Sequence, residues 1–70
     1  MDNDVARRRK EAGLTQQQLA EAVSVSRQSI ISIERGRFDP TLKVAFRIAQ
    51  VLGCAIEDAF APATRSADEP

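Results

Sequence analysis

The side chains with the clearest capacity for specific binding lie between residues 27 and 32. Arg27 can donate two parallel hydrogen bonds, and the Gln28 amide can donate one while accepting another. At 3.6 residues per turn, a helix through this segment would carry Arg27, Gln28, Ile31 and Ser32 on one arc of about 140°. Such a surface fits planar groups with paired donors and acceptors, such as the edges of nucleic-acid bases.

The chain offers little for catalysis or metal binding. It has no histidine and one cysteine, which excludes imidazole-based metal sites, Ser-His-Asp triads and Cys-His dyads. Cys54 lies between Gly53 and Ala55 in an apolar neighbourhood, where we expect a small buried residue rather than a reactive thiol. We therefore expect a protein that is not an enzyme and that uses neither a metal nor another cofactor.

Length and composition predict one soluble domain. A chain of 70 residues, 43% of them hydrophobic, can build a single core, and no apolar run approaches the roughly 20 residues that cross a bilayer. Because the first thirteen residues lack the apolar stretch of a secretory signal, we expect a cytoplasmic protein. The formal net charge is zero, and the Lys and Arg residues are only mildly concentrated before residue 38, so charge neither favours nor excludes nucleic acid.

The apolar spacing predicts an all-α fold of five helices over residues 1–61, followed by a polar flexible tail over 62–70. With their caps, the expected helices span about 3–12, 15–23, 26–35 and 41–52, and a short fifth segment holds Ile56 and Phe60. Thr15 and Gln18 have the spacing of a capping box, and Ser26 is a good N-cap. We expect inward-facing side chains at Val5, Ala12, Leu19, Ala20, Val23, Ile30 and Ile33, with Phe38 tucked onto the core. In the helix over 41–52, one apolar arc holds Leu42, Ala45, Phe46, Ile48, Ala49 and Leu52, and Val44 and Val51 widen it beyond what one small core needs.

The segment from Thr15 to Gly36 closely resembles the helix-turn-helix of the phage repressor and Cro family, the XRE-like transcriptional regulators. The resemblance rests on an LTQ-x-x-LA opening, a V-S-R-Q turn, an I-x-x-I-E-x-G ending and the Phe-x-Pro-Thr that follows, within about residues 4–60. It implies a lambda-repressor-like DNA-binding domain in which helices 2 and 3 form the motif and the helix over about 26–35 enters the major groove. The implied function is sequence-specific transcriptional regulation by occupancy of an operator.

The resemblance also assigns the DNA contacts. The expected base-reading residues are Arg27, Gln28, Ile31 and Ser32, and the expected phosphate contacts are Gln16, Gln17, Ser26, Arg35 and Arg37. Ile31 suits either a thymine methyl group or a partner protein. For Arg35 and Arg37, the alternative to a phosphate contact is a solvated surface position.

Three further residues bear on the architecture. Arg9 and Glu34 match positions that form a buried ion pair in the family, which would tie the first helix to the end of the third. Ser24 stands at the turn where the family usually has glycine. If the backbone there is left-handed, serine adds a strain of about 1 kcal/mol that glycine would avoid.

One such module touches few base pairs, so we expect a homodimer on a two-fold symmetric operator in double-stranded DNA, without a small-molecule effector or a membrane. The candidate dimer interface is the surplus apolar arc of the helix over 41–52, with Val44, Val51, Ile56 and Phe60 nearby. The other possibility is that the fifth helix covers these residues. An alternative function is a protein-interaction module on the same fold, such as an antitoxin or a regulatory subunit, which the zero net charge and Ile31 would suit.

Overall fold

The computed structural model describes residues 3–60, and every regular element in that range is an α-helix. The helices are α1 (Val5–Glu11), α2 (Gln16–Val23), α3 (Arg27–Glu34), α4 (Leu42–Leu52) and α5 (Ile56–Phe60). The all-α prediction with five helices is therefore confirmed. The tail expected over 62–70 lies outside the described residues.

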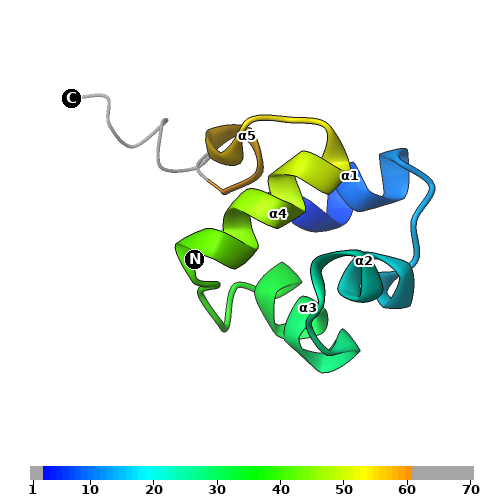
Figure 1. Cartoon of the computed structure of the whole chain (residues 1–70), viewed down its shortest axis with the longest axis vertical. Coiled ribbons are helices and arrows are strands. Elements are labelled where there is room, and N and C mark those ends of the chain that lie inside the picture. Colours follow the sequence, from blue (N-terminus) through cyan, green and yellow to red (C-terminus); the bar gives the residue numbers. More distant parts are fainter. Residues whose placement is uncertain (1–2, 61–70) are drawn as a thin grey trace.

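Helices α2 and α3 form one side of the molecule, and α4 and α5 form the other (Figure 1). Helix α4 packs on both α2 and α5, and α1 contacts α3, α4 and α5. As a result, α3 lies at the edge of the bundle with one of its faces turned away from the core. Within residues 3–60, no helix is both long enough and apolar enough to cross a membrane.

Side-chain caps fix where three of the helices begin. The Thr15 hydroxyl accepts a hydrogen bond from the Gln18 N–H at 3.0 Å, and the Gln18 side chain accepts one from the Thr15 N–H at 2.8 Å, which completes the predicted capping box. Ser26 caps α3 through the Ser29 N–H at 3.0 Å. Thr41 caps α4 in the same way. These local contacts set the start of the two helices of the motif.

The turn between α2 and α3 contains a serine in left-handed geometry. Ser24 has φ 61° and ψ 43°, and it has the only positive φ among the described residues that are not glycine. Behind the turn, the Val25 N–H donates to the Ala20 carbonyl at 3.0 Å. The left-handed backbone expected at this position is therefore present. It reverses the chain in a single residue and sets the angle at which α3 leaves α2.

The core is built from side chains of all five helices. Its largest fully buried members are Leu19, Ile30, Ile33, Ile48, Val5 and Val23. Phe60 and Ala59 close the core from α5. Cys54 packs against the core but is only partly buried, so the expectation of a buried residue holds in part.

Two expectations about the core were wrong. Ala12 is exposed, because α1 ends at Glu11 and the inner face of that helix is filled by Val5 and Arg9. Phe38 is 51% exposed, because the loop between α3 and α4 carries its ring outward beside α3.

The predicted dimer residues also require correction. Phe60 is only 7% exposed and belongs to the core of its own subunit, while Val44 and Ile56 are partly buried against that core. The cause is that α5 folds back onto α4, the alternative that the sequence left open. Val51 is 37% exposed, and the other exposed apolar side chains of α4 are Leu42 at 73% and Phe46 at 56%, both on the apolar arc expected for this helix.

Candidate nucleic-acid interface

Helix α3 turns Ile30 and Ile33 into the core and leaves its opposite face open. On that face Arg27 and Gln28 are exposed, and Ile31 and Ser32 are partly exposed. No hydrogen bond or ion pair with another described residue occupies the side chains of Arg27 or Gln28. The structure therefore places the four predicted base-reading residues together, with both long polar side chains free to bind.

Two hollows flank this open face of α3. One has a volume of about 190 Å³ and is lined by Ser26, Gln28, Ser29, Ser32 and Phe38. The other, of about 450 Å³, is lined by Ala6, Gln16, Arg27, Ile31, Glu34 and Arg35. The predicted base-reading residues are thus divided between two concave surfaces, with Gln28 and Ser32 beside one and Arg27 and Ile31 beside the other.

The predicted phosphate contacts differ in how free they are. Gln16 donates to Glu34 Oε1 at 3.0 Å, and Gln17 donates to Glu21 Oε2 at 3.0 Å. Ser26 is occupied by its cap and by the Ser29 hydroxyl at 2.9 Å. Each glutamine amide retains a second N–H. Since the first turn of a helix leaves backbone N–H groups without intrahelical partners, the start of α2 adds donors for an anion.

Arg35 and Arg37 follow α3 in the sequence and are both exposed. Arg35 lines the larger hollow together with Arg27. Within residues 3–60, neither arginine is held by an acidic side chain. The Arg35 guanidinium therefore supplies positive charge beside Arg27, and Arg37 is a second exposed cation two residues further along the chain.

An ion pair holds α1 against the end of α3. Arg9 Nε lies 2.6 Å from Glu34 Oε2, and the two side chains are only 10% and 7% exposed. The same guanidinium donates to the Leu14 carbonyl at 2.9 Å. The structure thus brings together the two residues that the resemblance paired, and the carbonyl bond uses a further donor of the buried arginine.

Two residues next to the site were not predicted to belong to it. Asn3 donates from Nδ2 to the Ile33 carbonyl at 2.7 Å and accepts from the Val5 N–H at 3.1 Å, so it links the start of α1 to the last turn of α3. Phe38 lines the smaller hollow. The signal for Asn3 was its place beside a helix start. For Phe38, the signal was an aromatic residue in a loop between Gly36 and Pro40.

Comparison with known proteins assigns this arrangement to a family. A family model described as helix-turn-helix matches residues 5–58. An uncharacterized HTH-type transcriptional regulator of Methanocaldococcus jannaschii is 57% identical over 47 residues, which cover 67% of this chain and 71% of that protein. The immunity repressor protein of Bacillus phage phi105 is 44% identical over 48 residues, which cover 69% of this chain and 33% of the repressor.

A solved structure agrees with these sequence matches. The clp gene regulator ClgR of Corynebacterium glutamicum superposes with a TM-score of 0.73 at 30% identity, and the match covers 77% of this chain and 57% of that chain. The predicted resemblance and the predicted fold are therefore both confirmed. The chain belongs to the helix-turn-helix family of transcriptional regulators.

Proposed function

We propose that this chain is a sequence-specific DNA-binding transcriptional regulator that acts by occupying an operator, with α3 in the major groove. The observation that carries the proposal is the open face of α3, where Arg27 and Gln28 lie exposed and unpaired opposite the buried isoleucines. Arginine can bind guanine O6 and N7, and glutamine can bind adenine N6 and N7. This function requires binding alone and no catalytic group.

The phosphate contacts in this proposal come from both ends of the motif. Arg35 and Arg37 lie beyond α3, and the first N–H groups of α2 lie before it. Gln16 and Gln17 contribute their remaining amide N–H groups, and the Ser26 hydroxyl can donate its hydrogen to a phosphate while its oxygen accepts the cap from the Ser29 N–H. These contacts orient the domain on the duplex, and the base contacts from α3 give it sequence preference.

We further propose that two copies bind a two-fold symmetric operator as a homodimer. One α3 helix spans few base pairs, and paired modules of this kind read half-sites about 34–36 Å apart. The exposed side chains of Leu42 and Phe46, which lie four residues apart on one flank of α4, supply the surface that such a dimer would cover. This surface replaces the one expected from Phe60, which the core uses.

Electrophoretic mobility shift with a random DNA pool, followed by selection and sequencing, tests the proposal. We expect an enriched half-site repeated with two-fold symmetry, and a binding constant that falls steeply as salt is raised because phosphate contacts release counterions. Absence of enrichment at low salt would contradict sequence-specific binding. Enrichment of one unrepeated half-site would contradict the dimer alone.

A second function, a protein-interaction module on the same fold, is favoured by one observation. The exposed Leu42 and Phe46 lie on a chain whose formal net charge is zero, and that combination suits a protein partner. In that case the random pool would yield no preferred site, and substitutions at Arg27 and Gln28 would leave partner binding unchanged.

A further inference from the structure

Phe38 is an exposed aromatic residue beside the face that α3 presents. The loop that carries it runs from the end of α3 to the start of α4 and lies next to α3 (Figure 1). Its ring is half exposed, and it lines the hollow of about 190 Å³ together with Gln28 and Ser32. An apolar side chain therefore lies against two of the predicted base-reading residues.

The lining of this hollow combines an apolar wall with hydrogen-bonding side chains. The ring offers an apolar wall, the Ser32 hydroxyl can donate or accept, and the Gln28 amide can do both at once. Ser26 and Ser29 are less available, because their hydroxyls lie 2.9 Å apart and Ser26 caps the helix. In the major groove, thymine presents a 5-methyl group and an O4 acceptor side by side, and its methyl is the one apolar group on the base edges there.

We propose that Phe38 is a specificity-determining residue that receives the 5-methyl group of a thymine in this hollow, with Ser32 donating to O4 of the same base. The inference rests on the proposed function and names the base that this part of the site reads. Covering the ring with the methyl removes apolar surface of both partners from water.

The assignment is separate from that of Ile31. Ile31 lines the hollow on the other flank of α3, with Arg27 and Arg35, whereas Phe38 lines the hollow beside Gln28 and Ser32. A methyl group against Phe38 therefore belongs to a different base pair from one against Ile31. Substitutions at the two residues will affect different positions of the operator.

The test replaces each thymine of the selected operator by uracil, which removes the methyl group and keeps the hydrogen-bonding groups. Fluorescence anisotropy then gives the ratio of uracil to thymine Kd at each position. For the wild type we expect a loss of roughly fourfold at the thymine that Phe38 contacts, as for one buried methyl group. In Phe38→Ala that ratio should fall to about one, and in Phe38→Leu it should fall only in part.

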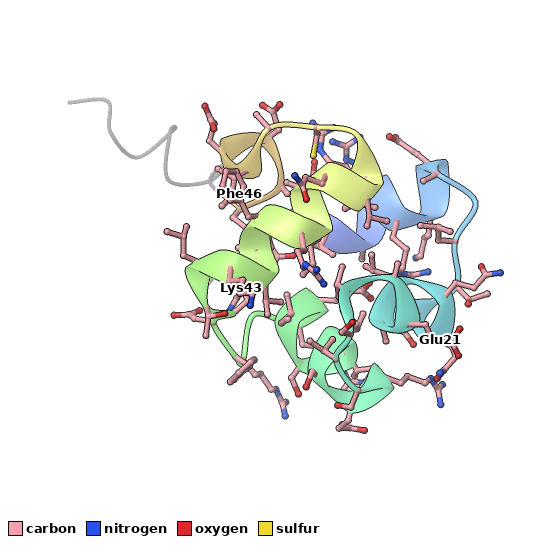
Figure 2. All side chains as sticks on the ribbon, in the orientation of Figure 1. Glu21, Lys43 and Phe46 are labelled. Atoms are coloured by element: carbon pink, nitrogen blue, oxygen red, sulfur yellow. The ribbon has the colours of Figure 1, made fainter. Side chains whose placement is uncertain are left out.

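Phe46→Ala is the matched control. Phe46 is a phenylalanine of similar exposure on α4, and it lies on the α5 side of that helix, away from α3 (Figure 2). Its replacement should leave every uracil-to-thymine ratio unchanged, even if overall affinity falls. Ile31→Ala should also keep the ratio at the Phe38 position. Thermal melts of each variant confirm that it is folded.

Two results would overturn the inference, and they can be told apart. If Phe38→Ala is folded and keeps the wild-type ratio at every position, Phe38 reads no methyl group while the proposed function stands. If the wild type selects no operator, the proposed function fails and the inference falls with it.

Discussion

Gln16 and Glu34 are joined by a hydrogen bond of 3.0 Å, which attaches a predicted phosphate contact to the ion pair beneath it. One carboxylate oxygen of Glu34 accepts from Gln16, and the other lies 2.6 Å from Arg9 Nε. Glu34, the last residue of α3, therefore joins that helix to both α1 and α2. Gln16, a proposed phosphate contact, is thus positioned by the same residue that holds the helices together.

Glu34→Ala is expected to lower the free energy of unfolding by about 3–5 kcal/mol, because it leaves the buried charge of Arg9 uncompensated. Urea denaturation followed by circular dichroism measures this loss. The matched control is Glu21→Ala. Glu21 also accepts a hydrogen bond from a glutamine of α2, Gln17, but it is exposed on the surface (Figure 2).

The control variant should change the free energy of unfolding by less than about 0.5 kcal/mol, as is usual at surface positions. A similarly small change in Glu34→Ala would show that the ion pair contributes little and that apolar packing alone holds α1 in place. A large loss in both variants would indicate a general effect of removing a glutamate.

Arg27→Ala and Gln28→Ala should each cost about 1–3 kcal/mol of binding free energy at one base pair and relax the preference there. Arg37→Ala should instead weaken binding to all sequences alike and reduce its salt dependence, because a phosphate contact carries no sequence information. Repeating the random-pool selection with each variant measures both effects. An unchanged half-site in both α3 variants would exclude these side chains as base readers.

Ser24→Gly should raise the free energy of unfolding by up to about 1 kcal/mol, because glycine adopts the left-handed geometry without strain. The reciprocal variant is Gly53→Ala. Gly53 has φ +71°, and an added Cβ would meet no heavy atom within 4 Å, so this substitution introduces backbone strain without a clash. Thermal melts should show the two substitutions shifting Tm in opposite directions, and a lower Tm for Ser24→Gly would contradict the account of the turn.

Local features of the fold were predictable because they depend on residues close together in sequence. The capping box of Thr15 and Gln18 and the cap at Ser26 follow from spacing alone. The contact between Arg9 and Glu34 spans 25 positions, and it was expected only because of the family resemblance.

Apart from Ala12, which follows the end of α1, the errors concern packing between residues that are far apart in the sequence. Nothing near Phe38 in the sequence shows that its loop turns outward, and nothing near Phe60 shows that α5 folds onto α4. Both outcomes depend on how the helices share one small core. The same limit applies to the hydrogen bonds of Gln16 and Gln17, whose partners became visible only in three dimensions.

The interaction between Asp4 and Arg7 predicts a dependence of stability on pH. The Asp4 carboxylate accepts a hydrogen bond from Arg7 Nε at 2.9 Å, and this contact holds the pKa of Asp4 below its ordinary value of 3.8. A carboxyl group whose pKa is lower in the folded state stabilises that state fully above its unfolded pKa. The contribution is lost as the pH falls through the lowered value.

Asp4→Asn should therefore remove part of the acid-induced fall in Tm and leave the remaining carboxylates to account for the rest. Thermal melts at about pH 6 and about pH 3 give the fall in Tm for the wild type and for Asp4→Asn, and the two falls are then compared. Because the pair lies at the surface, the effect should be small and should shrink as salt is added. An identical fall in Tm with and without Asp4 would contradict this contribution.

The two exposed apolar flanks of α4 can be tested separately as the dimer interface. Phe46 and Leu42 are four residues apart and share one flank, whereas Val51 lies about 140° around the helix axis from Phe46. If the homodimer forms over the Leu42 flank, Phe46→Glu will place a charge in the interface and convert the dimer to monomer in sedimentation velocity. Val51→Glu will leave the dimer intact, because its flank stays in water.

The opposite pattern would assign the interface to Val51, and two variants that sediment as the wild type would place the dimer contact away from α4. Since both side chains are already exposed, neither substitution should lower Tm by more than a few degrees, and the comparison therefore reports on assembly and not on folding.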